Sequence, residues 1–134
     1  SSKAYIDRHL DICAKIKKPL VMEEFGYPRD DFKFALGTPT KGRDGFYEYV
    51  FGLVGDNAKK GGCFAGCNFW GWGGYAQPKH EEQWLVGDDY TGDPAQEAQG
   101  LNSVFVGDES TLSVIKAHAE SMGRIKDERL KIKD

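Results

Sequence analysis

Apolar residues recur along the chain with two different periods, and these periods predict three helices and two strands. Residues 3–17, the segment from Asp44 to Lys60, and residues 110–122 place apolar side chains every three or four positions, which is the spacing of a helix with one buried face. Gly61 and Gly62 mark the end of the second helix, because glycine commonly stops a helix. The faces expected to be buried are Ile6, Leu10 and Cys13 in the first helix, Phe46, Tyr49, Val50 and Leu53 in the second, and Leu112, Ile115, Ala119 and Met122 in the third.

The first predicted strand ends in two carboxylates. Leu20, Val21 and Met22 form a short apolar run, which predicts a buried strand of a parallel sheet. Side chains alternate between the faces of a strand, so Glu23 and Glu24 should point to opposite sides and at most one should enter an active site. On this segment alone, two solvated glutamates at a strand end are an equally good interpretation.

The second predicted strand runs from Phe64 to Trp70. Its alternation separates two faces, with Phe64, Gly66, Asn68 and Trp70 on one and Ala65, Cys67 and Phe69 on the other. Because the side-chain period of a strand is two, Asn68, Trp70 and Trp72 share one parity.

The order of the predicted elements is helix, strand, helix, strand, helix, which indicates an α/β fold with a right-handed crossover between parallel strands. Two parallel strands cannot form a sheet that is covered on both faces, and loops of about 17 and about 38 residues are long for a small independent domain. Both loops follow the carboxyl ends of strands, where barrels and open sheets place their active sites. We therefore expect the chain to be part of a larger (β/α)₈ barrel, a fold of about 250 residues.

Composition and charge limit the partners of this chain. Its 134 residues, 40% hydrophobic and 29% charged, are typical of a soluble globular domain. A net charge of −3 argues against binding to the phosphate backbone of nucleic acids. No apolar run approaches the roughly 20 residues needed to cross a bilayer, and Ser1-Ser2-Lys3 lacks the apolar core of a signal peptide. The expected partner is neutral or weakly charged, and neither a nucleic acid nor a membrane.

Cysteine and acidic residues do not predict a metal or a cofactor. Cys63 and Cys67 lie about 13 Å apart if the strand between them is extended, which is too far for a disulfide. No histidine has zinc-ligand spacing from them, so we expect Cys13, Cys63 and Cys67 to be three buried thiols. The acidic cluster from Asp88 to Asp93 does not have the spacing of a calcium-binding loop.

Tryptophan is concentrated near the end of the second predicted strand. Trp70 and Trp72 belong to the segment Asn68-Phe69-Trp70-Gly71-Trp72-Gly73-Gly74-Tyr75, and Trp84 follows in the loop. An indole presents a flat apolar face and one polar N–H, which suits the C–H face of a neutral sugar. Burial of Trp70 or Trp72 in the core is the alternative.

Several segments together resemble glycoside hydrolase family 5, and its endo-β-1,4-mannanases most closely. The segments are Lys18 to Gly26, Arg43-Asp44-Gly45-Phe46-Tyr47, Asn68 to Gly74, Thr91-Gly92-Asp93-Pro94, and Gln99 to Phe105. The resemblance covers residues 1–122 in order and leaves residues 123–134 as a charged tail. It implies the C-terminal portion of a (β/α)₈ TIM barrel, with the two strands as barrel strands seven and eight and the first helix following strand six.

The resemblance also implies roles for individual residues. The family's nucleophile is the Glu that directly precedes an aromatic residue and Gly at the end of strand seven, which here is Glu24, with Glu23 as its outward neighbour. Such a carboxylate attacks the anomeric carbon in the retaining mechanism. The tryptophan platform maps onto Trp70, with Trp72 as second choice. The loop from Gly73 to Asn102, with Trp84 and Asp88, would border the remaining sugar sites.

The chain departs from the family pattern in one decisive respect. The family's acid/base Glu lies in an Asn-Glu-Pro motif at the end of strand four, and this sequence contains no such tripeptide. We therefore expect the 134 residues alone to be inactive, and to pair with a missing N-terminal part of the barrel or to self-associate. The expected substrate is β-mannan, and the expected location, by resemblance, is extracellular or periplasmic.

Two alternatives remain open. The chain could be a non-catalytic carbohydrate-binding module that uses its tryptophans as a platform, in which case Glu24 would be dispensable. It could also belong to a family 5 enzyme that acts on cellulose or another β-glucan.

Overall fold

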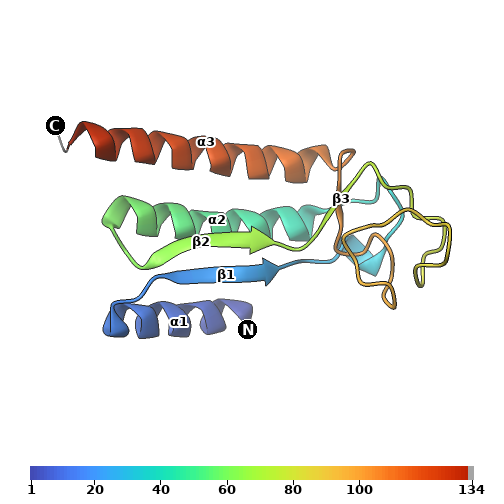
Figure 1. Ribbon diagram of the computed structural model, residues 1–134, viewed down its shortest axis with the longest axis horizontal. Coiled ribbons are helices and arrows are strands. Elements are labelled where there is room, and N and C mark those ends of the chain that lie inside the picture. The colour runs from blue at the N-terminus through green and yellow to red at the C-terminus, as the bar shows by residue number, and fades with distance from the viewer. Residues whose placement is uncertain (133–134) are drawn as a thin grey trace.

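The computed structural model describes residues 1–132 and confirms the predicted order of the main elements (Figure 1). Helix α1 and helix α2 flank strand β1, and strand β2 leads through a long loop to helix α3. The bounds are α1 Ser2–Ile16, β1 Leu20–Phe25, the 3₁₀ turn η1 Asp30–Phe32, α2 Lys41–Lys60, β2 Phe64–Phe69, β3 Trp72–Gly74, β4 Val104–Phe105 and α3 Glu109–Lys131.

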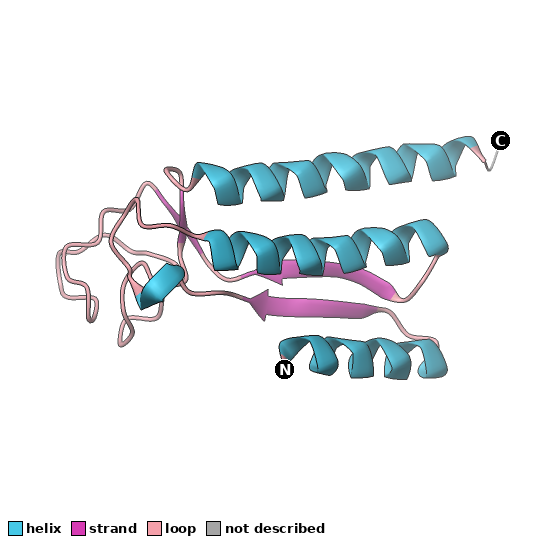
Figure 2. Ribbon diagram, turned by 180° about the vertical axis from the view of Figure 1, so that it is seen from behind, coloured by secondary structure: helices cyan, strands magenta, loops and turns pink. Residues whose placement is uncertain are grey.

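Strands β1 and β2 are neighbours and run parallel, as predicted. Two views from opposite sides show α1 beside β1, and α2 between the strands and α3 (Figure 1, Figure 2). The same views place the long loops together, beyond the carboxyl ends of both strands. The loop after β2 also contains β3 and β4, which pair in parallel with each other and which the sequence pattern did not predict.

Helix α2 begins one turn earlier than predicted because a residue from the preceding loop caps it. The carboxylate of Asp30 accepts hydrogen bonds from the backbone N–H groups of Lys41 and Gly42, each at 3.0 Å. These groups have no partner within a helix, so Asp30 allows the helix to start at Lys41. The other end is as predicted, since Gly61 ends the helix in the left-handed conformation.

The buried faces of α2 and α3 differ in part from the prediction. On α2, Val50 is buried as expected, but Phe46, Tyr49 and Leu53 are only half-buried. The fully buried residues of α2 are Arg43, Tyr47, Val50, Phe51 and Val54. The face of α2 that packs on the sheet is therefore rotated around the helix axis from the predicted face. Its residues Tyr47, Val50, Phe51 and Val54 form one core cluster with Phe25 and Phe64.

Helix α3 does not stop at Met122, as the sequence pattern predicted, but continues to Lys131. Ala119, expected inside, is exposed, whereas Ile125 beyond the predicted end is buried. The guanidinium of Arg129 lies close to Gly61 at the end of α2, so the extra turns still pack along α2. Most of the predicted charged tail is therefore helical, and its last residues, Lys133 and Asp134, lie outside the described residues.

Strand β2 contains an extra residue near its start. Leu20 is opposite Phe64, but the next residue of β1, Val21, is opposite Gly66. Such a bulge changes which side chains share a face. Phe64 consequently packs in the helix-covered core together with Cys67 and Phe69, which contradicts the simple alternation predicted for this strand.

Strand β1 contains a compensating extra residue near its end. Met22 is opposite Cys67, and Phe25 is opposite Phe69. Three steps along β1 therefore correspond to only two steps along β2. Met22 and Phe25 both face the core, and Glu23 and Glu24 between them are both exposed. The bulge interrupts the period of two at this point, and exposure of both side chains is compatible with opposite directions, so their separation onto two sides stays a prediction.

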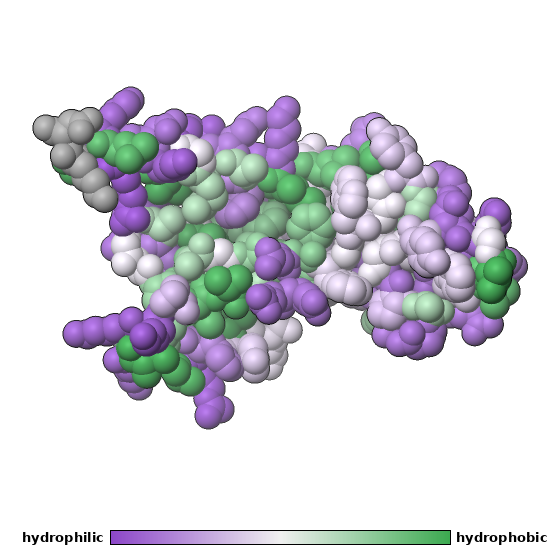
Figure 3. Space-filling view, in the orientation of Figure 1, coloured by the Kyte–Doolittle hydropathy of each residue, from purple (hydrophilic) through white to green (hydrophobic). Residues whose placement is uncertain are grey.

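One face of the β1–β2 pair remains uncovered. Val21 is 47% exposed, and Ala65 and Asn68 of β2 are also exposed. A space-filling view shows apolar residues gathered over the middle of the molecule on the side drawn in Figure 1 (Figure 3). Parallel strands are normally buried on both faces, so this surface is typical of a sheet face that packs against further structure.

None of the helices in the described part is long and apolar enough to cross a membrane.

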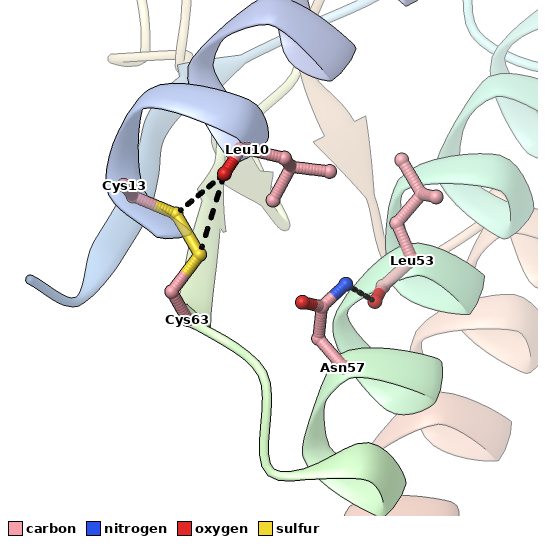
Figure 4. The surroundings of a disulfide bond; sticks show 5 residues. All are labelled: Leu10, Cys13, Leu53, Asn57 and Cys63. Carbon is pink, nitrogen blue, oxygen red and sulfur yellow. Dashed lines mark hydrogen bonds between the residues drawn. A yellow bond between two sulfur atoms is a disulfide. The ribbon is translucent and has the colours of Figure 1, made fainter. Parts of the chain in front are cut away.

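A disulfide joins Cys13 at the end of α1 to Cys63 just before β2 (Figure 4). The prediction of three thiols is therefore wrong, because the fold brings the Cα atoms of these two residues to 6.2 Å across 50 positions of sequence. The exclusion of a Cys63–Cys67 bond was correct. Cys67 is a free, half-buried thiol, and burial raises its pKa to about 11.

Replacing both Cys13 and Cys63 by Ser should lower the free energy of unfolding by about 2–4 kcal/mol, since the bond restricts the unfolded chain. Urea denaturation of the two proteins, with the Cys67→Ala variant as a control that keeps the disulfide, measures the difference. Equal stability of the oxidised and the fully reduced protein would contradict the prediction.

Candidate active site

The end of β1 brings Glu24 next to the segment that carries Trp70. Glu24 lies in the bulge with a positive φ of 54°, and its carboxylate side chain is exposed. The next carbonyl, that of Phe25, accepts a hydrogen bond from the N–H of Trp70 at 2.7 Å. A Cβ atom on Gly26 would lie only 2.9 Å from the carbonyl oxygen of Trp70, so glycine allows the two strand ends to approach this closely.

The tryptophan segment leaves β2 at Trp70 and enters β3 at Trp72. Trp70 is half-buried, Trp72 is 55% exposed, and the peptide bond between Trp70 and Gly71 is cis. Gly71 packs against the backbone of Gly92, where a Cβ atom would meet the Gly92 oxygen at 2.8 Å. Neither indole is a fully buried core residue, so both remain available at the surface near the strand ends.

Trp84 and Asp88 form a separate cluster in the loop after β3. The indole of Trp84 stacks on the ring of Tyr90, with centroids 5.2 Å apart, and donates its N–H to the carbonyl of Asp88 at 3.1 Å. Among the described residues, no hydrogen bond or stacked ring pair joins this cluster to Glu24 or Trp70.

The Asp88 carboxylate is engaged within its own loop. It accepts hydrogen bonds from the N–H of Leu85 at 2.9 Å and from Nδ1 of His80 at 2.8 Å, and its side chain is only 4% exposed. The Leu85 N–H, and to a lesser degree His80, lower the pKa of Asp88. These contacts give Asp88 a role in shaping the loop, so any contact with sugar would have to come mainly from its neighbours.

The sequence reasoning missed two buried arginines that tie the loops together. Arg29 follows β1, and its guanidinium forms a two-pronged salt bridge with Asp108, with N–O distances of 2.8 and 2.6 Å. Its remaining N–H groups donate to the carbonyls of Thr38, Gly100 and Ser103. All five donors of this guanidinium are therefore satisfied, which a fully buried cation requires.

Arg43, in the first turn of α2, is also fully buried and binds three carbonyl groups. It donates to the carbonyls of Tyr27 at 2.9 Å, Leu101 at 2.8 Å and Ser103 at 3.0 Å. Burial, and then the neighbouring Arg29 cation, lower the pKa of Arg43, but a guanidinium remains protonated in proteins.

Asp93 binds residues 100–103, the segment whose carbonyl groups the two arginines also contact. Its carboxylate accepts hydrogen bonds from the N–H groups of Gly100 and Asn102 and from the hydroxyl of Ser103. Two cations and two carboxylates thus balance in charge around residues 100–103. The described residues contain no group of three or more His, Cys, Asp or Glu side chains that could hold a metal ion.

The sequence offered only an indirect signal for this network. Arg43 and Asp93 lie in segments that carry the family resemblance, and the partners of Asp93 are only 7 to 10 residues away. Arg43, however, binds carbonyls 58 and 60 residues away, and Arg29 binds Asp108, which is 79 residues away. Spacing in the sequence cannot reveal such contacts.

Comparison with known proteins decides the family. The sequence matches the family described as "GH family 5 beta-mannosidase-like" over residues 1–127. The chain belongs to this glycoside hydrolase family. The resemblance to family 5 that the sequence motifs indicated is therefore confirmed.

Family relatives are considerably longer than this chain. It is 26% identical over 123 residues to "Putative mannan endo-1,4-beta-mannosidase 4" of Arabidopsis thaliana, a match that covers 90% of this chain and 25% of that protein. The crystal structure of the glycoside hydrolase family 5 mannosidase from Rhizomucor miehei superposes with a TM-score of 0.80 at 28% identity, covering 93% of this chain and 31% of that one.

A mutant of the same Rhizomucor miehei enzyme, in complex with mannosyl-fructose, matches with a TM-score of 0.77 at 28% identity and covers 93% of this chain and 32% of that one. The family 5 chain described here thus spans about a quarter to a third of the relatives it matches. Its α/β architecture corresponds to one portion of a larger family 5 fold.

Proposed function

We propose that this chain supplies the catalytic nucleophile of a retaining glycoside hydrolase, and that the whole protein cleaves internal β-1,4-mannosidic bonds in mannans. One observation carries the proposal: in a family 5 chain, an exposed glutamate at the end of β1 lies beside the tryptophan segment at the end of the neighbouring strand β2. Neighbouring carboxyl ends of parallel strands are where such folds gather their catalytic groups.

Glu24 is the proposed nucleophile. Its ionised carboxylate attacks the anomeric carbon, the bond to the departing sugar oxygen breaks, and a glycosyl-enzyme ester forms. A second carboxyl group, about 5–5.5 Å from the first in retaining enzymes, protonates the departing oxygen and then activates water for hydrolysis of the ester. Trp70 and Trp72 offer indole faces on which the sugar ring can rest.

The acid/base carboxyl must come from outside these 134 residues. The sequence lacks the Asn-Glu-Pro motif of the family, so we place the acid/base group on an earlier strand. The resemblance to family 5 supports the assignment of β1 and β2 to barrel strands seven and eight. The uncovered apolar face of the β1–β2 pair supports a partner at this surface, either the preceding part of the protein or a second copy.

The mannan substrate is proposed from the relatives. Their names differ in whether they describe cleavage inside the polysaccharide chain. The Arabidopsis protein is described as a mannan endo-1,4-beta-mannosidase, whereas the family description and the Rhizomucor miehei structure speak of mannosidases. Removal of terminal mannose units is therefore the second candidate function.

Assays of the full-length protein on linear β-1,4-mannan, cellulose and β-mannobiose separate these functions. We expect the viscosity of the mannan solution to fall before much reducing sugar appears, no activity on cellulose, and at least about 10³-fold less activity for the isolated chain, which lacks half of the catalytic pair. Release of mannose alone, with unchanged viscosity, would identify terminal cleavage. Activity only on cellulose would overturn the substrate.

An extracellular or periplasmic location accompanies this proposal. Mannan is a large polysaccharide, and the Cys13–Cys63 disulfide is typical of proteins in oxidising compartments.

A further inference from the structure

The first turn of α2 holds the chain that leaves β1. Arg43 is fully buried, and its Nε donates to the carbonyl of Tyr27 at 2.9 Å. Tyr27 lies only three residues after Glu24. The two other nitrogens of the same guanidinium donate to the carbonyls of Leu101 and Ser103, in the segment before β4. A rigid, planar guanidinium with several donors fixes these backbones relative to one another.

Tyr47, one turn further along α2, contacts both strand ends directly. Its hydroxyl donates to the carbonyl of Trp70 at 3.4 Å, and its ring meets the ring of Phe25 edge-on at 5.0 Å. Phe25 is the residue after Glu24. Tyr47 is fully buried, and this burial raises its pKa far above neutrality, so the phenol remains a hydrogen-bond donor at ordinary pH.

The segment that Arg43 holds in turn supports the tryptophans. The carbonyl of Gly71 accepts a hydrogen bond from the N–H of Val104 at 2.8 Å, and the N–H of Gly71 donates to the carbonyl of Asn102 at 3.4 Å. Gly71 separates Trp70 from Trp72. Arg43 is therefore connected through hydrogen bonds to the backbone that follows β1 on one side, and through residues 101–104 to the backbone of Gly71 between the two tryptophans on the other.

We propose that Arg43 and Tyr47 are positioning residues, which together set the separation between the Glu24 carboxylate and the indoles of Trp70 and Trp72. The inference rests on the proposed function of Glu24. Neither residue is exposed, so neither is expected to touch the sugar. A displacement of about 1 Å between the nucleophile and a sugar resting on the indoles can cost about 10²-fold in rate. The indole faces that bind the sugar are themselves unchanged in either variant, so kcat should fall and KM should change little.

Tyr47→Phe and Arg43→Lys in the full-length protein test the proposal. Tyr47→Phe removes one hydroxyl from a buried ring, and we expect kcat on mannan to fall by about tenfold with KM within about twofold. Arg43→Lys keeps the charge but loses the planar fork, and we expect kcat to fall by about 100-fold. Rates are expressed per active site, counted from the burst of leaving group released by an activated aryl β-mannoside.

Matched controls are Tyr49→Phe, a half-buried tyrosine two residues along α2, and Arg124→Lys, an exposed arginine on α3. Both should keep kcat and KM within about twofold.

The proposal is overturned if kcat per active site stays within twofold in the variants that fold, or if activity falls only because fewer sites are counted. If Arg43→Lys does not fold, Tyr47→Phe decides alone. A parallel Glu24→Gln variant distinguishes a failure of the positioning role from a failure of the proposed function. If Glu24→Gln is inactive and Tyr47→Phe is normal, only the positioning role is wrong. If Glu24→Gln is active, the proposed function is wrong and the positioning role falls with it.

Discussion

Glu24→Gln in the full-length protein should lower kcat on mannan by at least about 10³-fold and leave the binding of mannan oligosaccharides nearly unchanged. The amide has the shape of the carboxylate but cannot form the glycosyl-enzyme ester, and loss of a nucleophile costs far more than loss of a binding contact. The indoles of Trp70 and Trp72 remain in place, so the affinity should persist. Initial rates and calorimetric titration with a mannan oligosaccharide measure the two effects.

Glu23→Gln is the matched control, because the bulge of β1 leaves Glu23 and Glu24 adjacent and both exposed. We expect kcat of this variant to stay within about threefold of the unmodified protein. Loss of activity in Glu23→Gln, with activity kept in Glu24→Gln, would exchange the two assignments. Full activity in both variants would mean that neither glutamate is the nucleophile, and would favour a binding module for this part of the chain.

The helices and the parallel strand pair could be predicted because their signals are local. Helical spacing of apolar residues, a serine before α1 and a glycine after α2 are all visible within one element. The strand ends were less predictable. Both bulges depend on how β1 packs against β2, so the sequence of either strand alone could not show that Phe64 packs in the core together with Cys67 and Phe69.

Contacts between distant residues explain most of what the sequence did not predict. The Cys13–Cys63 bond and the salt bridge between Arg29 and Asp108 join residues 50 and 79 positions apart. Asp88 shows the same limit at short range, since the family resemblance placed it in the loop that would border the sugar sites. Only the folded loop shows that the carboxylate is used by Leu85 and His80.

The buried salt bridge at Asp108 should have the largest effect on stability. Asp108→Ala is expected to lower the free energy of unfolding by about 3–5 kcal/mol, because it leaves the Arg29 cation buried without its counter-ion. The Asp108 side chain is 4% exposed, and it also accepts the N–H of Phe105 at 2.9 Å, so the substitution breaks three hydrogen bonds at once. Urea denaturation of the full-length protein measures the loss.

Glu120→Ala supplies the comparison, since Glu120 forms an exposed ion pair with Lys116 on α3 at 4.0 Å, and such pairs contribute about 0–1 kcal/mol. If both variants lost equally little stability, the buried charges would have to be satisfied by the backbone carbonyls alone. A replacement of both Arg29 and Asp108 by apolar residues tests this further. It removes the unpaired charge but leaves the carbonyls of Thr38, Gly100 and Ser103 without their donor. We therefore expect the double variant to be less destabilised than the sum of its single variants, and still less stable than the unmodified protein.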